Sequence, residues 1–168
     1  MRCSKRHQYL SKNKKIKFYG FDSFEGFGKL NENESHPFYN DENFKTSFKR
    51  VEKRVRKIAS TDEAKLVKGF FNETLKLNPD KYNIKKAKVI FIDSDTYSSA
   101  KLAFDFCKNI IQPGTYLIID DYFSYKGSEN KGVAKAFNEF LDIIHFNCRS
   151  ILSYGNGGKV FILSDKKS

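Results

Sequence analysis

The sequence predicts an α/β fold whose sheet is mainly parallel and closes with a C-terminal antiparallel hairpin. Short apolar runs alternate with helical patterns, two of the runs end in aspartate clusters, and a glycine-rich turn separates the last two strands. Alternating strands and helices favour right-handed crossovers between parallel strands. We find no internal repeat and no linker, so we expect a single domain over residues 1–168.

The first half of the chain contains two predicted strands and one predicted helix. Residues 15–21 (KIKFYGF) alternate between polar and apolar as a strand does, and the turn DSFEGFG follows. Residues 29–43 are polar and predict a long loop, for which a lid and a disordered insertion both stay open. Residues 44–59 have the apolar spacing of an amphipathic helix with a basic outer face. Residues 65–71 (KLVKGFF) predict a short strand that ends at Gly69.

The second half repeats the alternation and ends in the hairpin. Residues 87–93 (AKVIFID) are continuously apolar up to the aspartate, which is typical of a strand buried on both faces. A helix over 98–111 stops at QPG, and a second buried strand follows at 115–120. Another helix is predicted over 131–144. Residues 148–164 predict two strands about a glycine-rich turn.

Composition argues against a nucleic-acid-binding, a membrane-spanning and a disulfide-rich secreted protein. The formal net charge is +11, but the lysines are scattered and no aromatic RNA-binding motif accompanies them. A solvated basic surface is the favoured explanation, and a basic nucleic-acid-binding module is the lesser alternative. No apolar run approaches the roughly 20 residues of a membrane span, and the N-terminus lacks a signal-peptide pattern. Cys3, Cys107 and Cys148 form neither a zinc nor a disulfide pattern, which favours the cytoplasm.

Acidic side chains follow three of the predicted strands. Asp22 follows the first, Asp93 and Asp95 follow the run VIFI, and Asp120 and Asp121 follow YLII. In open α/β sheets, ligands bind at the carboxyl ends of the strands. If the strand before Asp93 and the strand before Asp120 are parallel neighbours, they lie about 4.8 Å apart and their terminal carboxylates converge. Such anions repel unless a cation joins them, and oxygen ligands without His or Cys indicate magnesium, or else manganese or calcium.

These aspartates also have structural interpretations. Asp95 or Thr96 could cap the helix predicted over 98–111. Asp22 could bind the ribose of a nucleotide cofactor, or could form the turn before SFEG. For the D-x-D and D-D pairs after two successive buried strands, a binding site is the favoured interpretation.

Four segments resemble the macrocin O-methyltransferase family. They are FYGFDSFEGF (18–27), VKGFFNETL (67–75), IDSDTYSSAKLAF (92–104) and PGTYLIIDDY (113–122). The resemblance spans about residues 15–141. It implies a Rossmann-like class I methyltransferase sheet and an S-adenosylmethionine- and Mg²⁺-dependent O-methyltransferase that acts on a sugar or polysaccharide hydroxyl. It also implies a small-molecule or glycan acceptor and no specific nucleic acid; a homo-oligomer is possible in principle.

The resemblance assigns roles to individual residues. Asp93 would be a metal ligand and the general base, and Asp120 and Asp121 would be the other metal ligands. The cofactor-binding residues, next to the ribose and the adenine, would be Asp22, Ser23, Gly69 and Phe70.

The sequence departs from the family at its N-terminus. In the family a first, central strand and a glycine-rich loop precede the segment equivalent to residues 15–21. Here only MRCSKRHQYLSKNK precedes residue 15, and it contains no glycine. We therefore expect the sheet to lack its first strand and the glycine-rich loop. The alternative to an intact enzyme is a non-catalytic remnant or fragment that needs a separate N-terminal piece.

Overall fold

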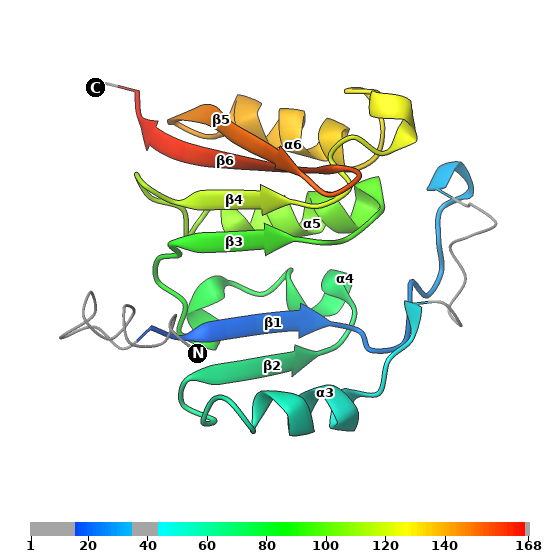
Figure 1. The fold of residues 1–168 in the computed structure, drawn as a ribbon, viewed down its shortest axis with the longest axis vertical. Helices are drawn as coiled ribbons and strands as arrows, with labels where there is room; N and C mark the ends of the chain where they lie inside the picture. The colour runs from blue at the N-terminus through cyan, green and yellow to red at the C-terminus, as the bar shows by residue number, and fades with distance from the viewer. Residues whose placement is uncertain (1–15, 35–43, 167–168) are drawn as a thin grey trace. The chain divides into compact units, whose positions relative to one another are not determined.

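The computed structural model describes residues 16–34 and 44–166, and Figure 1 shows its elements. The described residues form two compact units, each with its own sheet. The units comprise residues 16–28 with 44–69, and residues 29–34 with 70–166. None of the helices in these residues is long and apolar enough to cross a membrane. The expectation of one domain over 1–168 stays a prediction.

The first unit contains a two-stranded parallel sheet and one helix. β1 (Phe18–Asp22) pairs along its whole length with β2 (Ala64–Lys68). The helix α3 (Phe48–Val55) lies between them in the sequence. Both strands overlap the segments that the sequence predicts.

The helix α3 is shorter than the predicted helix over 44–59. Ser47 is its N-cap, and its side chain accepts a hydrogen bond from a backbone amide of the first turn. Phe48 packs edge-on against Phe24, with ring centroids 5.0 Å apart. After the helix, Arg56 Nη2 donates to the carbonyl of Ala64 at 2.8 Å and ties the helix end to β2. The cap at Ser47 fixes the start of the helix four residues later than the apolar spacing suggests.

The second unit contains a four-stranded sheet in the order β3-β4-β6-β5 (Figure 1). β3 (Val89–Ile92) and β4 (Tyr116–Ile119) are parallel neighbours. β6 (Gly158–Asp165) is antiparallel to β4 and to β5 (Phe146–Tyr154). The parallel pair and the C-terminal hairpin predicted from the sequence are both confirmed.

Two long helices cover one face of this sheet. α5 (Tyr97–Cys107) and α6 (Gly132–Ile143) lie behind it in the view of Figure 1. Phe104 of α5 contacts Phe137 of α6 with ring centroids 5.6 Å apart, and Phe137 contacts Phe161 of β6 at 4.6 Å. The strand side chains buried on this side are Ile90, Ile92, Leu117, Ile119, Phe161 and Leu163. The remaining helical segments are short: η1 (Glu32–Glu34), α4 (Phe71–Thr74), η2 (Pro79–Tyr82) and η3 (Tyr125–Gly127).

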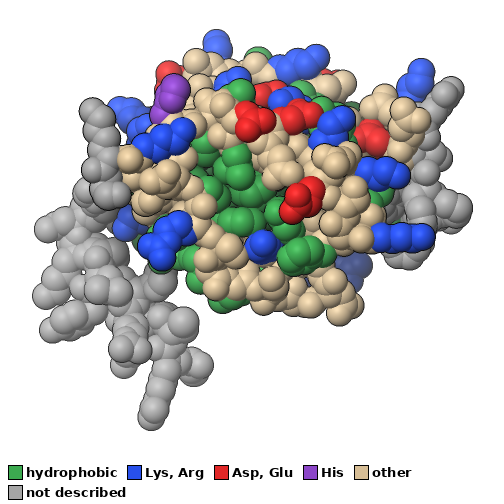
Figure 2. Space-filling view, turned by 90° about the horizontal axis from the view of Figure 1, so that it is seen from above, with side chains coloured by type: hydrophobic (Ala, Val, Ile, Leu, Met, Phe, Trp, Pro, Cys, Tyr) green, Lys and Arg blue, Asp and Glu red, His purple; other side chains and the backbone are tan. Residues whose placement is uncertain are grey.

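The opposite face of the four-stranded sheet is apolar and exposed. Val89 and Phe91 of β3 are 59% and 57% exposed, and Leu152 of β5 is 50% exposed. Figure 2 looks onto the β5 side of the molecule rather than onto this face, and shows hydrophobic side chains at the surface there between charged ones. The expectation that the strand over 87–93 is buried on both faces was therefore wrong, because α5 and α6 both pack on the same side of the sheet.

The pairing of the described strands can be compared with the expectation that the family's first strand is missing. Among them, β1 pairs only with β2, and β3 has β4 as its only neighbour. No strand within the described ranges therefore occupies the place expected of the family's first strand. Residues 1–14 and the part 35–43 of the predicted loop lie outside the described residues. The lack of the first strand and of the glycine-rich loop stays a prediction.

Candidate functional site

The carboxyl ends of β3 and β4 lie side by side. Ile92 and Ile119 are register partners at the ends of the two strands, and Asp93 and Asp120 follow them directly. The backbone amide of Asp120 donates to the carbonyl of Ile92 at 2.8 Å. The two parallel strands therefore deliver both acidic segments to one edge of the sheet, as the sequence predicts.

Three carboxylates meet at this edge. Asp93, Asp95 and Asp121 each offer one carboxylate oxygen, and these oxygens lie within 4.8 Å of one another. Asp93 is exposed, whereas Asp95 and Asp121 are half-buried. Asp95, which the sequence presents as a candidate cap, therefore lies within the acidic cluster.

The backbone holds two of these aspartates in the left-handed region. Asp95 has a φ of 54° and Asp121 a φ of 53°. This conformation is uncommon for residues other than glycine, and Asp tolerates it better than most. Thr96, the other candidate cap, is the N-cap of α5 and accepts a hydrogen bond from the Ser99 amide at 3.3 Å. Ser124 Oγ donates to Asp121 Oδ1 at 2.9 Å and orients that carboxylate.

The cluster carries strong electrostatic repulsion. Burial, and after it the charges of Asp121 and Asp93, together raise the pKa of Asp95 to about 7. Asp120 adds a smaller effect on the same pKa, so it lies within electrostatic reach. The buried hydroxyl of Ser94 has no hydrogen-bond partner among the described residues. This edge of the sheet therefore combines unbalanced negative charge with an unsatisfied polar atom.

Asp120 is oriented by a residue that the sequence did not single out. The Tyr154 hydroxyl donates to Asp120 Oδ1 at 3.0 Å. Asp120 does not belong to the group of three whose oxygens lie within 4.8 Å, although the family resemblance makes it a metal ligand. The only sequence signal near Tyr154 is the glycine-rich turn that follows it, which predicts a hairpin but no contact with an aspartate.

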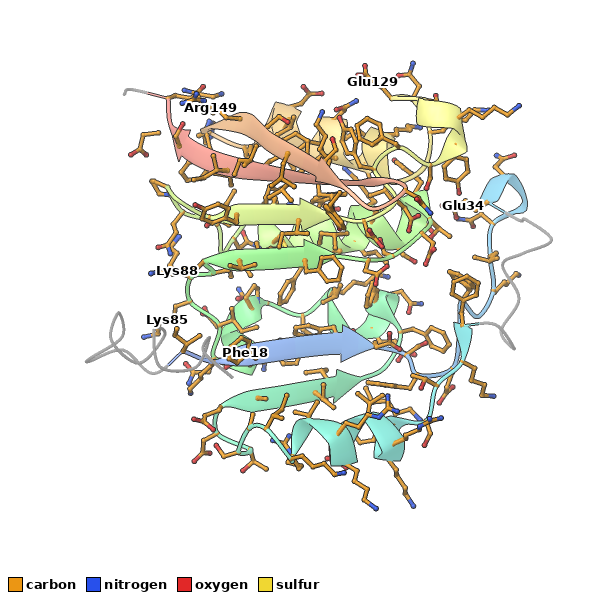
Figure 3. All side chains as sticks on the ribbon, viewed as in Figure 1. Phe18, Glu34, Lys85, Lys88, Glu129 and Arg149 are labelled. Carbon is orange, nitrogen blue, oxygen red and sulfur yellow. The ribbon has the colours of Figure 1, made fainter. Side chains whose placement is uncertain are left out.

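Glu34 is a second residue that sequence reasoning missed. Its buried carboxylate accepts hydrogen bonds from the Ser98 amide at 2.6 Å, the Ser98 hydroxyl at 2.8 Å and Asn31 Nδ2 at 2.8 Å. Figure 3 shows Glu34 beyond the carboxyl ends of the strands, whereas Lys88 lies at the opposite end of β3. The described start of the predicted loop is thus fixed to the first turn of α5, next to the acidic cluster.

The predicted cofactor residues are distributed over both units. Asp22 ends β1, and its Oδ1 accepts a hydrogen bond from the Phe24 amide, which is the turn-forming role that the sequence offered as an alternative. Ser23 Oγ donates to the Gly26 carbonyl at 2.7 Å. These contacts leave the predicted binding of the ribose untested.

The other two predicted cofactor residues follow β2. The Gly69 amide donates to the Asp22 carbonyl at 3.0 Å, and Gly69 has a φ of 147°, in the range that favours glycine. Phe70 belongs to the second unit, where it is the N-cap residue of α4. Their predicted contact with the adenine stays a prediction.

The donor set of the acidic cluster suits a hard divalent cation. Each of the three clustered aspartates supplies an oxygen, and Mg²⁺ and Ca²⁺ both prefer oxygen ligands. Neither His nor Cys belongs to the cluster, which disfavours zinc. A cation bound here would also relieve the repulsion that, after burial, contributes to the raised pKa of Asp95.

The sequence matches the pattern of a known protein family over most of its length. Residues 7–145 match the pattern of the family described as Macrocin-O-methyltransferase (TylF). The chain belongs to the macrocin O-methyltransferase family. The matched residues include β3, β4 and all four aspartates that follow them. No protein of curated function is significantly similar to the chain in sequence.

Solved structures similar to this member of the macrocin O-methyltransferase family share its fold. The O-methyltransferase NovP superposes with a TM-score of 0.71 at 17% identity, over 94% of this chain and 64% of NovP. The calicheamicin methyltransferase CalS11 gives a TM-score of 0.72 at 19% identity, over 95% of this chain and 65% of CalS11. An O-methyltransferase from Bacillus cereus in complex with SAH superposes with a TM-score of 0.55 at 14% identity. The match covers 96% of this chain and 80% of the Bacillus cereus protein.

These likenesses confirm the predicted α/β fold of the Rossmann-like class I methyltransferase type. At such low identities they show the fold alone. The chain spans less than two thirds of the length of NovP and of CalS11.

Proposed function

We propose that the chain acts in S-adenosylmethionine-dependent O-methylation of a sugar or polysaccharide hydroxyl in the cytoplasm, assisted by a divalent cation. One observation carries the proposal. Asp93, Asp95 and Asp121 offer oxygens within 4.8 Å of one another at the carboxyl edge of β3 and β4, in a chain of the macrocin O-methyltransferase family. Such a group of carboxylates can hold a divalent cation, which assists the deprotonation of a hydroxyl.

The residues of the acidic edge have distinct proposed roles. Asp93, Asp120 and Asp121 are the proposed ligands of the cation. Asp93 and Asp121 belong to the group of close oxygens, in which Asp95 is the neighbouring carboxylate. A bound divalent cation lowers the pKa of an acceptor hydroxyl and thereby supplies a better nucleophile. Asp93, which is the exposed member of the cluster, accepts the proton that the hydroxyl releases.

The transfer of the methyl group itself depends on how the two reactants are placed. The acceptor oxygen attacks the methyl carbon of S-adenosylmethionine, the carbon–sulfur bond breaks, and S-adenosylhomocysteine leaves. The sulfonium already activates the methyl group, so in-line placement of the two reactants completes the task. Asp22 and Ser23 at the end of β1 are the proposed contacts of the ribose, and Gly69 and Phe70 those of the adenine.

A labelled-methyl assay tests this function. Purified chain is mixed with S-adenosylmethionine carrying a labelled methyl group, Mg²⁺ and a panel of sugars, nucleotide sugars and oligosaccharides. We expect transfer to a hydroxyl of at least one acceptor from an assembled active form, which includes a separate N-terminal piece where the chain alone is inactive, and loss of transfer when a chelator removes Mg²⁺. Transfer that persists unchanged in the chelator would contradict the role of the cation, and transfer to RNA instead of sugars would contradict the acceptor class.

A further inference from the structure

The end of the β5–β6 hairpin is shaped to hold one tyrosine. Tyr154 and Gly158 are register partners at the last rung of the two strands. A Cβ atom at position 158 would overlap the Tyr154 ring. The absence of a side chain at Gly158 therefore lets the ring lie across the hairpin, and any larger residue would displace it.

The same hairpin is joined to the loop that carries the aspartates. The Phe123 amide donates to the Gly157 carbonyl at 2.9 Å. Ile119 of β4 pairs with Lys159 of β6, so the sheet ladder continues up to the last residue before Asp120. The hairpin end and the loop after β4 are thus held together by backbone hydrogen bonds, and Tyr154 has a fixed base from which to reach Asp120.

The hydroxyl of Tyr154 is a permanent donor at neutral pH. A tyrosine hydroxyl ordinarily loses its proton only at about pH 10, so it carries that proton at neutral pH. A protonated phenol next to a carboxylate can only donate to it, which fixes the direction of the hydrogen bond.

We propose that Tyr154 is a positioning residue of the cation site: by donating to Oδ1 of Asp120 at 3.0 Å, it holds that carboxylate so that its second oxygen serves as a ligand. The inference rests on the proposed function, because it presupposes a cation at the acidic edge. Partners that hold a ligating carboxylate typically change metal affinity 10- to 100-fold when they are removed.

Calorimetric titration with Mn²⁺ tests the proposal, because it needs no acceptor and no turnover. The variant Tyr154→Phe keeps the ring and removes the hydroxyl. Tyr82→Phe is the matched control, because the Tyr82 hydroxyl is also in a hydrogen bond, at 2.8 Å, but to the Thr74 carbonyl. We expect about 10- to 100-fold weaker Mn²⁺ binding in Tyr154→Phe and unchanged binding in Tyr82→Phe. The thermal midpoints without metal report any general loss of stability.

The other possible results of the titration each contradict the proposed role of Tyr154. Wild-type affinity in Tyr154→Phe overturns the inference and leaves the proposed function intact. Equal weakening in both tyrosine variants assigns Tyr154 a general structural role and also overturns it. No Mn²⁺ binding by the wild type overturns the proposed function and the inference with it. If Tyr154→Phe fails to fold, Gly158→Ala replaces it, since the added methyl group displaces the ring, and unchanged Mn²⁺ affinity in that folded variant overturns the inference.

Discussion

The carboxylate of Glu34 accepts two hydrogen bonds from Ser98, one from its backbone amide at 2.6 Å and one from its hydroxyl at 2.8 Å. The two residues are separated by 64 positions in the sequence. Ser98 lies in the first turn of α5, where backbone amides lack helical partners and negative charge is favourable. This contact holds the start of a polar loop beside the candidate site.

Replacing Glu34 by alanine should therefore reduce stability. The Ser98 amide, which is partly buried, loses its acceptor. An unsatisfied buried donor costs about 1–3 kcal/mol, so we expect a loss near the lower end of that range. Urea denaturation measures the change, with Glu129→Ala as a control at an exposed glutamate. A free energy of unfolding within about 0.5 kcal/mol of the wild type would show that Glu34 does not hold the loop.

Magnesium should raise the thermal midpoint of the folded chain. A ligand that binds only the native state stabilises it by about 2.7 kcal/mol at a concentration one hundred times its Kd. Asp121→Asn should reduce the rise, because it removes a charged oxygen from the cluster, whereas the exposed Asp142→Asn should keep it. Scanning calorimetry with and without Mg²⁺ gives the comparison, and an equal rise in both variants would remove Asp121 from the site.

Asp93→Asn should abolish most of any methyl transfer. Loss of a general base costs about 10²- to 10⁴-fold in rate, and loss of metal would add to that. The measurement is kcat/KM with a turning-over acceptor, and Asp142→Asn serves as the control. Activity retained within about tenfold would assign the base to another residue, and Asp95 in the same cluster would be the next to test.

Two thiols should resist alkylation in the folded chain. Burial raises the pKa of Cys107 to about 12 and that of Cys148 to about 11, against an ordinary value of 9.0. Because the thiolate is the reactive form, we expect iodoacetamide at pH 8 to label both at least about a hundredfold more slowly than in the unfolded chain. Mass spectrometry of peptides follows each site, and rapid labelling of Cys107 in native buffer would contradict its burial.

Two phenylalanines of the second unit should differ in their contribution to stability. Phe104 of α5 is 1% exposed and packs against α6, whereas Phe91 is 57% exposed on the face of the sheet that no helix covers. Phe104→Ala should cost about 3–5 kcal/mol, because it leaves a cavity in the core. Phe91→Ala should cost about 1 kcal/mol or less, since it loses only cross-strand contacts. Equal losses in urea denaturation would mean that another surface covers Phe91.

The sequence by itself determined the order of the elements and the edge on which the aspartates lie. Apolar runs of strand length followed by Asp93 and Asp120 are a local signal, and side chains that directly follow parallel strands reach the same edge wherever the strands pair. The hairpin was predictable for the same reason, because its turn chemistry is local. The motifs around these aspartates carried the family resemblance as well.

Only the tertiary structure decided which groups meet. The side chain of Asp95 joins Asp93 and Asp121 because two residues adopt left-handed backbone conformations, which no periodicity encodes. Tyr154 reaches Asp120 across 34 positions and Glu34 reaches Ser98 across 64, through contacts that depend on how loops and hairpins fold back. The burial of β3 on a single face was likewise invisible in its continuous apolar run, since composition reports a preference for burial and only packing supplies the partner.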